Sequence, residues 1–282
     1  MSERPRISAM CLVKNEERWI WYALMSALDF VDEIIVGDTG STDRTVEIIR
    51  SINSPKIHFS EYGSVDKQEF TNCRNRQLEQ ATGDWLLVLD GDELWTPRQI
   101  SELLPKLTQA KPEQITVAVR FFNCVGDIYH YQDDHFSSYR KWDIEGNITC
   151  RLMRRSIPGL TCNGPYGVEG FYDETGREIF EESTKDQVIL LKERYVHATF
   201  LVRSNSVLGD WQIPYRRGKF LNVLGVRDMP KDFDYPSSFS KKPPSGVNTP
   251  WRQRPVVFFW FFGFLSSLAY RAWKIKSRIN AR

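Results

Sequence analysis

The sequence predicts an α/β fold, in which helices flank an open sheet in one domain of roughly 230 residues with appendages. Three observations support this prediction. The chain has 282 residues, 41% of them hydrophobic and 13% aromatic, so it can bury a large core. Apolar runs alternate with helix-like stretches through the first part of the chain, as in parallel βαβ units. The apolar runs end in turns rich in acids and glycine, where such sheets bind ligands.

The elements of this first part follow in order from the positions of the apolar residues. Residues 7–13 ("ISAMCLV") are almost wholly apolar and predict a buried strand. Residues 33–38 ("EIIVGD") and 84–90 predict two more strands, and 56–60 a short one. The intervening stretches predict helices at 17–28, 42–52 and 69–81.

Three polar turns follow these strands and are expected to converge. They read "KNEE", "DTGSTDRT" and "DGDE". Because the carboxyl ends of parallel strands lie at one edge of a sheet, the turns should form one ligand site there.

The second turn has one acid that local structure does not explain. Gly40 allows a tight turn, Ser41 or Thr42 can cap the next helix, and Asp43 suits its first turn. Asp38 ends the buried strand and has no such role. An acid at this place can accept hydrogen bonds from a nucleoside.

The third turn, Asp90 to Glu93, permits two interpretations. As a plain polar turn it precedes a helix with Thr96 at the N-cap and Pro97 at its first position. As a binding site, Asp90 and Asp92 offer oxygen ligands to Mn²⁺ or Mg²⁺, which also binds substrate phosphates.

"ISAMCLVKNEE", "VGDTGSTDRT" and "NCRNRQLEQATGDWLLVLDGDE" together resemble the nucleotide-sugar half of inverting family 2 glycosyltransferases of GT-A fold, such as bacterial lipopolysaccharide-core and envelope-glycan enzymes. The resemblance implies an open mixed sheet and a base pocket beside Asp38. It places Arg74 near the nucleotide, Asp90 near the ribose, Asp92 on the metal and Glu93 in support. The residues that it assigns to the donor site are Val13, Lys14, Asn15, Glu16, Asp38, Gly40, Ser41, Arg74 and Asp90.

The resemblance also implies residues in the second half, where it is looser. An inverting transferase needs a base for the acceptor hydroxyl. Relatives have His-Glu where this chain has Val168 and Glu169, so Glu169 is the candidate base. Its competitors are the loop acids Asp127, Asp133, Asp134 and Asp173. His197 is either a third metal ligand or a structural histidine. The basic residues beyond it, which suit either phosphates, anionic lipid or solvent, are Arg203, Arg216, Arg217 and Lys219.

Charge is divided unevenly along the chain. Nine basic and no acidic residues follow Asp234, which leaves 29 basic against 36 acidic residues before it. Residues 256–270 ("VVFFWFFGFLSSLAY") are mostly apolar, and as a helix they span about 22 Å, short of the ~30 Å hydrocarbon core. We expect this segment to lie in one leaflet, although a buried core helix is the alternative.

These features predict the domains and the location. We expect a glycosyltransferase domain at 1–225, a linker at 226–254 and a membrane-associating segment at 255–282. Five scattered cysteines without metal-site spacing, and an N-terminus without a signal-peptide core, indicate a reducing cytosol. The protein is therefore expected at the cytoplasmic face of the cell membrane, peripheral or monotopic.

The predicted function is metal-dependent, inverting transfer of a hexosyl or N-acetylhexosaminyl group. The donor is a nucleotide-diphosphate sugar, with UDP-sugar favoured, and the acceptor a glycan or lipid-linked molecule of the envelope. Two alternatives remain: a nucleotidyltransferase, although "LVKNEERWI" has no phosphate-binding glycine, and a non-catalytic nucleotide-sugar-binding module. Nucleic acid is excluded as a partner because the basic charge lies beside an apolar tail.

Overall fold

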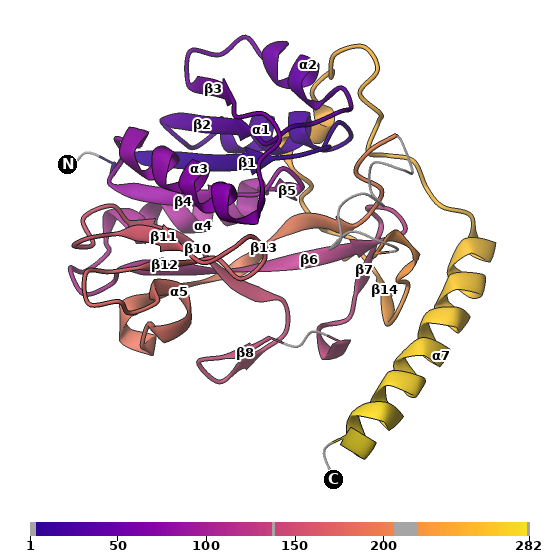
Figure 1. The fold of residues 1–282 in the computed structure, drawn as a ribbon. Coiled ribbons are helices and arrows are strands. Elements are labelled where there is room, and N and C mark those ends of the chain that lie inside the picture. Colours follow the sequence, from indigo (N-terminus) through magenta and orange to yellow (C-terminus); the bar gives the residue numbers. More distant parts are fainter. Residues whose placement is uncertain (1–3, 137–138, 206–218, 281–282) are drawn as a thin grey trace.

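The computed structural model describes residues 4–136, 139–205 and 219–280. Its centre is a ten-stranded mixed sheet with helices on both faces (Figure 1). In the first part, β1 (Ile7–Val13) lies between β2 (Glu33–Asp38) and β4 (Trp85–Leu89), and β3 (Ile57–Glu61) follows β2. These four strands are parallel. The α/β prediction with a parallel first half is therefore confirmed.

The second half of the sheet is mixed. β10 (Ile148–Arg154) runs antiparallel between β4 and β6 (Thr116–Val125). β13 (Val188–Phe200) is parallel to β6 and antiparallel to the short β5 (Glu93–Leu94). β7 (His130–Gln132) and β14 (Val226–Asp228) complete the far edge. Two small hairpins lie outside the sheet: β8 (Arg140–Lys141) with β9 (Ile144–Glu145), and β11 (Thr161–Asn163) with β12 (Gly170–Tyr172).

The alternation of side chains along β1 divides the core in two. Ile7, Ala9 and Cys11 belong to the larger cluster, which includes residues of α1 (Ile20–Ala27), α2 (Thr45–Arg50) and α4 (Pro97–Thr108). Met10 belongs to the opposite cluster, beside α3 (Lys67–Gln80), the β11–β12 hairpin and α5 (Ile179–Glu182). Packing on both faces explains why these strands are apolar throughout rather than alternating.

Residues 226–254, expected to be a linker, pack against the domain. β14 extends the sheet by pairing with β7. Met229, Phe239 and Val247 are buried in the main core, and the ring of Phe239 lies 5.5 Å from that of Tyr22 in α1. The segment is thus a part of the folded domain, because its apolar side chains fill the surface beside α1.

The chain then enters α7 (Val256–Asn280), which projects along one side of the molecule (Figure 1). Ser266 Oγ accepts a hydrogen bond from Val223 N at 3.1 Å, and Phe259 packs against the His130 ring. Within the described residues, no helix combines the length and apolar character needed to cross a bilayer. All five cysteines are buried free thiols.

Candidate active site

The turns that follow β1 and β2 are bonded to each other. Asn15 N donates to Ser41 Oγ at 2.8 Å, and Thr42 N donates to Asn15 Oδ1 at 2.7 Å. Asn15 is buried and has a φ of 54°, a left-handed conformation that non-glycine residues seldom adopt outside turns and functional sites. The predicted convergence of these two turns is confirmed.

The helix-capping roles predicted for Ser41 and Thr42 are wrong. α2 begins only at Thr45, and its N-cap residue is Arg44, which makes no side-chain cap. Ser41 and Thr42 instead bond Asn15, as described above. Asp43 does serve the helix start, since its Oδ1 accepts a hydrogen bond from Thr45 N at 3.0 Å.

Asp38 ends β2 with one oxygen used and one available. Its Oδ2 accepts hydrogen bonds from the backbone N–H groups of Gly40 and Ser41, both at 2.9 Å. Oδ1 is buried and has no hydrogen-bond partner among the described residues. Gly40 has a φ of 91°, and a Cβ there would lie 2.8 Å from the Cα of Ser64, so the turn requires glycine. A buried acceptor without a partner is rare and indicates a place for a donor from a ligand.

The turn after β4 packs closely on the first turn. A Cβ on Gly91 would lie 3.0 Å from side-chain carbons of both Glu16 and Val13, so a larger residue would have to displace these side chains. Val13 itself is buried at the end of β1, and its carbonyl accepts a hydrogen bond from Thr39 N at 2.9 Å. All three predicted turns therefore meet at the carboxyl edge of the parallel strands.

Arg203 joins two of these turns. Its guanidinium forms an ion pair with Asp92 and another, at 2.9 Å, with Glu16. Both acids are buried. Burial opposes the charge on the guanidinium, yet Asp92 and Glu16 raise the pKa of Arg203 above its ordinary value. His197 Nε2 lies 3.4 Å from Asp92 Oδ2, because β13 pairs His197 with Glu93 across the short β5.

Asp90 and Glu93 share a second arginine. Arg151 of β10 lies 3.0 Å from Asp90 Oδ2 and 2.5 Å from Glu93 Oε1. The Tyr195 hydroxyl donates to the same oxygen of Glu93. Burial raises the pKa of Glu93, and the attraction of Arg151 opposes that shift. Glu93 is thus a buried support for Asp90, whose side chain is 40% exposed.

The predicted metal ligands do not form a metal site as arranged. Asp92 and His197 lie together, but Arg203 already neutralises Asp92, and Asp90 is bound to Arg151. Among the residues that the structure describes, no three carboxylate, histidine or cysteine side chains are grouped to hold an ion. In this arrangement Asp92 Oδ2 lies beside both the Arg203 guanidinium and His197 Nε2.

Arg74, predicted near the nucleotide, lies against the middle of β1. It is buried, so the alternative of an exposed helix arginine is wrong. Its Nη1 donates to Met10 O at 3.1 Å and to Gln77 Oε1 at 3.0 Å. Gln77 in turn donates to the carbonyls of Cys11 and Ile35. The described bonds of Arg74 thus hold α3 against the sheet.

Glu169 differs from the other candidate bases in its local bonds. It is half-buried in the loop between β11 and β12, and within the described part of the chain it accepts a hydrogen bond from Gly167 N. The same loop is fixed to the start of α3, where Tyr166 N donates to Lys67 O at 2.9 Å. The competitors all have charged partners: Asp127 pairs with His130, Asp133 with Arg227, Asp134 with Arg120 and Arg194, and Asp173 with Arg177.

Sequence reasoning assigned no role to Arg151 and Tyr195, and it did not connect Arg203 with Asp92. The charge of Arg151 in the middle of a mostly apolar strand was the available signal, because a buried charge needs a partner. Of the basic residues expected beyond His197, Lys219 lies 3.5 Å from Thr199 Oγ1. Arg216 and Arg217 lie outside the described residues.

The family model "Glycosyl transferase family 2" matches residues 8–164. A TPR repeat-containing protein of Synechococcus elongatus is 36% identical over 112 residues, which cover 40% of this chain and 27% of the relative. The prophage-derived glycosyltransferase SunS of Bacillus subtilis is 35% identical over 96 residues, which cover 34% of this chain and 22% of the relative. The chain thus spans about a quarter of the length of these relatives.

Solved structures of glycosyltransferases are also similar to this chain. S. aureus TarS 1–349 in complex with UDP-GlcNAc aligns with a TM-score of 0.46 at 17% identity, covering 68% of this chain and 58% of TarS. The mannosyltransferase PcManGT of Pyrobaculum calidifontis, in complex with GDP-Man and Mn²⁺, aligns with a TM-score of 0.37 at 24% identity, covering 43% and 36%.

Proposed function

The chain belongs to glycosyl transferase family 2, and on that premise we propose that it transfers a sugar, with inversion, from a nucleotide-diphosphate sugar to an acceptor hydroxyl. UDP-sugar is the favoured donor, and the group moved is a hexosyl or N-acetylhexosaminyl unit. The matched residues contain all three turns at the carboxyl edge of the sheet. The three turns of the proposed donor site therefore lie within the matched part of the chain, and Arg203 lies beyond it.

The observation that carries this proposal is the available oxygen of Asp38. A nucleoside offers N–H and O–H donors from its base and ribose, and Asp38 Oδ1 is a buried acceptor without a described partner. The strained turn at Asn15 and the glycine turn at Gly40 border the same acid. A strained turn around a buried acceptor without a described partner suits ligand binding better than a purely structural role.

The diphosphate would lie at the charged group around Asp92. Arg203 brings a permanent positive charge there, and a guanidinium binds phosphate oxygens through two parallel hydrogen bonds. Such a charge stabilises the nucleoside diphosphate as it leaves. We therefore assign to Arg203 the binding of the leaving group, and comparison of turnover with Mn²⁺, Mg²⁺ and EDTA tests whether a metal ion is also required.

Glu169 is the proposed base because its carboxylate is the least committed of the five candidates. Proton removal requires a carboxylate that can approach the acceptor, and the competitors are already paired with charged side chains. Glu169→Gln should lower turnover by roughly a hundredfold or more, within the range for general bases. Asp173→Asn, in the turn that follows β12, is the matched control and should remain active.

A donor screen tests the donor site directly. Purified protein is mixed with UDP, GDP, TDP and CMP sugars, each with Mn²⁺, Mg²⁺ or EDTA, and both the melting temperature and the released nucleotide are measured. We expect one donor class to stabilise the fold. Asp38→Asn keeps an oxygen for the Gly40 and Ser41 N–H groups but replaces the available acceptor by a donor, so it should abolish that stabilisation.

Asp66→Asn is the matched control for this variant. Asp66 caps α3, and asparagine caps helices about as well as aspartate, so nucleotide binding should persist. Failure of every donor to stabilise folded protein would contradict the proposal. Stabilisation without sugar transfer would favour the non-catalytic binding module, and pyrophosphate release from a nucleoside triphosphate would favour a nucleotidyltransferase.

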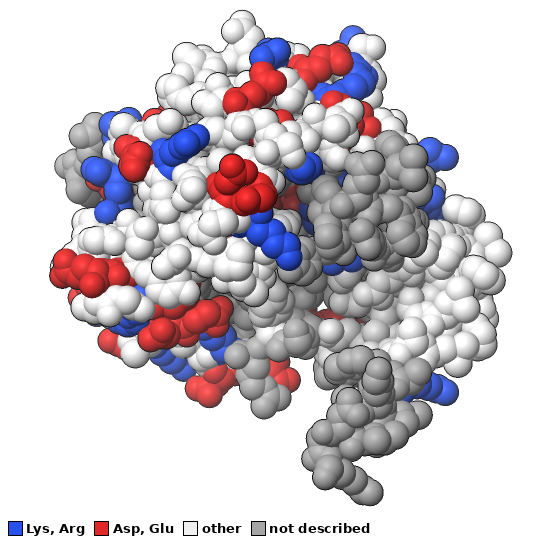
Figure 2. Space-filling view, viewed as in Figure 1, with Lys and Arg blue, Asp and Glu red and all other residues white. Residues whose placement is uncertain are grey.

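We further propose that α7 holds the enzyme at the cytoplasmic face of the membrane, where it acts on envelope polysaccharide, lipopolysaccharide or glycolipid acceptors. The most exposed apolar side chains of α7 follow one stripe: Val256, Val257, Trp260, Phe261, Phe264, Leu265 and Leu268. Figure 2 shows a broad uncharged surface over the first half of this helix. An exposed stripe of this kind supports insertion into one leaflet.

A further inference from the structure

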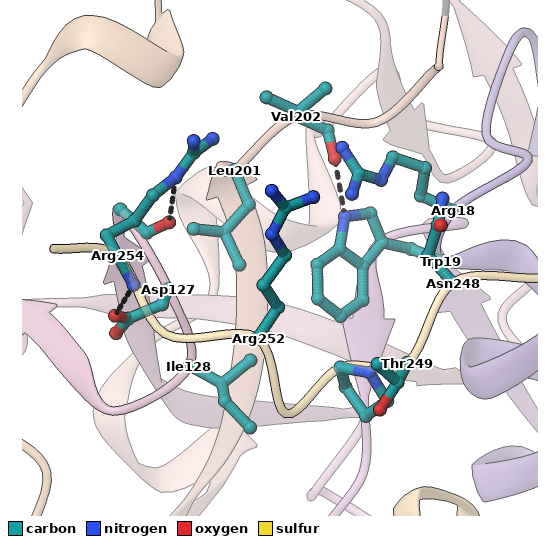
Figure 3. A pocket seen from close by; sticks show the side chains of 12 residues that line it. Arg18, Trp19, Asp127, Ile128, Leu201, Val202, Asn248, Thr249, Arg252 and Arg254 are labelled. Carbon is teal, nitrogen blue, oxygen red and sulfur yellow. Dashed lines mark hydrogen bonds between the residues drawn. The ribbon is translucent and has the colours of Figure 1, made fainter.

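A small cavity lies between the candidate active site and the start of α7 (Figure 3). One wall is formed by Arg18 and Trp19, just beyond Glu16, and another by Leu201 and Val202, just before Arg203. Arg18 N donates to Arg203 O at 3.1 Å, and Trp19 Nε1 donates to Val202 O at 2.9 Å. The cavity is therefore adjacent to the proposed donor site through two chain segments that are bonded together.

The lining of this cavity is strongly positive. Three arginines, Arg18, Arg252 and Arg254, line it, and Figure 3 shows their guanidinium groups on the same side of the cavity. Its acidic lining residue is Asp127, whose Oδ1 lies 2.6 Å from His130 Nδ1 and whose Oδ2 accepts from Arg254 N at 2.9 Å. Both oxygens of Asp127 are thus used, and the excess positive charge faces the cavity.

Two of the arginines come from the segment that leads into α7. Arg252 makes none of the described ion pairs, and its side chain reaches the centre of the cavity in Figure 3. Arg254 is held in place, because its Nε donates to Gly126 O at 3.2 Å and its guanidinium lies over the Phe258 ring of α7. The packing of α7 therefore helps to fix the position of this charge.

Size and charge together define the ligand class. The cavity volume is about 130 Å³, below the roughly 300–1,000 Å³ of sites that enclose whole small molecules. It suits a compact group with several negative oxygens. Guanidinium groups match phosphate oxygens through paired hydrogen bonds, and several of them around one anion favour the doubly charged phosphate monoester over a carboxylate.

We propose that this cavity binds a phosphate group, carried either by a membrane lipid or by a soluble phosphorylated molecule. Its place at the foot of α7 puts a bound phosphate near the depth expected for lipid head groups if the exposed stripe of α7 enters the membrane. The inference rests on the cavity itself and does not require sugar transfer.

Binding of glycerol 3-phosphate to the full chain tests the site, measured by calorimetry at constant ionic strength with chloride as the reference. Arg252→Gln removes one guanidinium from a residue with no described structural bond, and should weaken binding roughly ten- to a hundredfold. Arg252→Lys keeps the charge without the planar guanidinium. Its affinity for glycerol 3-phosphate should lie between those of the parent chain and Arg252→Gln. Lys242→Gln is the matched control, because this exposed residue of the same segment does not line the cavity.

Vesicle sedimentation separates the two sources of phosphate. If the phosphate is a lipid head group, the parent chain and Lys242→Gln should prefer phosphatidylcholine vesicles that contain phosphatidic acid over phosphatidylcholine alone, and Arg252→Gln should lose that preference. If glycerol 3-phosphate binding depends on Arg252 but vesicle binding does not, the ligand is soluble. No binding of glycerol 3-phosphate by the parent chain, or equal binding by the two glutamine variants, would overturn the proposal.

Neither measurement uses a sugar donor, so failure here leaves the proposed transfer untouched. The melting temperature of each variant without ligand shows whether it folds. Arg252 is exposed and lies outside the core, so its substitution should leave the fold unchanged.

Discussion

Arg203 changes how the acidic turn after β4 is understood. The acid pair after a buried strand predicts a cation site, and in the structure the positive charge beside Asp92 is the side chain of Arg203, which lies just beyond β13. The pair of Asp92 and Arg203 is buried, where the loss of one partner leaves an uncompensated charge. Residues at this site therefore affect stability as well as ligand binding, and experiments must measure both.

Asp92→Asn should lower sugar transfer by at least about a hundredfold, because Arg203, to which we assign the leaving group, loses the ion pair that holds it in position. The fold should persist, since Glu16 still pairs with Arg203, but the free energy of unfolding should fall by about 2 kcal/mol. Circular dichroism, denaturant unfolding and turnover measure these effects.

The matched control for this variant is Asp32→Asn. Asp32 accepts a hydrogen bond from Ile7 N at the opposite edge of the sheet, so this substitution makes the same chemical change away from the site. Its turnover should remain near that of the parent chain. Near-normal turnover in folded Asp92→Asn would exclude Asp92 from the reaction.

Arg203→Met should increase the affinity of the ligand-free protein for Mn²⁺ at least tenfold. Glu16 and Asp92 lose the guanidinium that neutralises them, so both carboxylates can attract the cation. The attraction between two opposite unit charges about 4 Å apart near a protein surface is about 4 kcal/mol. The signal of free Mn²⁺ in electron paramagnetic resonance measures this binding without any turnover. Unchanged affinity in folded protein would show that Arg203 does not compete with metal, and Arg203→Lys should give an intermediate value.

At the scale of elements, the first part of the chain was predictable and the second was not. β1 and β2 have the bounds expected from their apolar runs, because a strand packed on both faces has an apolar sequence with polar residues at its ends. β5, β8 and β9 have two residues each, and their sequences give no periodic signal. These strands form because longer neighbours pair with them, which local sequence does not encode.

The same contrast applies to the site. Asn15, Asp38 and Asp92 were identifiable because each follows a predicted strand within the turn that closes it. Arg151 was not assigned and the acidic partners of Arg203 were not predicted, because these partners lie 61 and 187 residues away in the sequence. The distribution of positive charge at the site depends on the pairing of β10 and β13 with the first half of the sheet.

The N-terminus of α4 gives a test of a confirmed sequence prediction. Thr96 is the N-cap residue, its Oγ1 accepts a hydrogen bond from Gln99 N at 3.3 Å, and it donates to Arg194 O at 3.0 Å. Thr96→Ala removes both bonds in a buried place and should lower the free energy of unfolding by about 1 to 2 kcal/mol. Thr108→Ala, at the exposed end of the same helix, should have a smaller effect. Equal effects in denaturant unfolding would contradict the capping role.

At the scale of the whole molecule, His130 links the domain to α7. Its Nδ1 lies 2.6 Å from Asp127 Oδ1, and its ring lies 4.3 Å from that of Phe259. The hydrogen bond to Asp127 raises the pKa of His130, while burial opposes the shift and Asp228 adds to it. The contact between His130 and Asp127 therefore holds the turn against which α7 packs.

A raised histidine pKa stabilises the folded state fully below the unfolded pKa of about 6.5, and this stabilisation is lost as the pH rises through the folded pKa. The melting temperature should therefore decline from pH 6 upward, and His130→Gln should reduce the slope. His135→Gln is the control, since this side chain is 91% exposed. An unchanged slope in His130→Gln would assign the pH dependence to other groups.

α7 carries the last prediction, because two of its faces have different environments. One face packs on Gly126, His130 and Val223, while the stripe from Val256 to Leu268 is exposed. Deleting residues 255–282 should release the chain from membranes, but it also uncovers the packed face. The triple variant Trp260→Ser, Phe261→Ser and Phe264→Ser changes only exposed side chains, and it should reduce partitioning into phosphatidylcholine vesicles by at least about a hundredfold. If the truncated chain and the triple variant both still sediment with the vesicles, the exposed stripe is not the membrane contact. The basic residues of segment 241–254, before the helix, would then have to account for the binding.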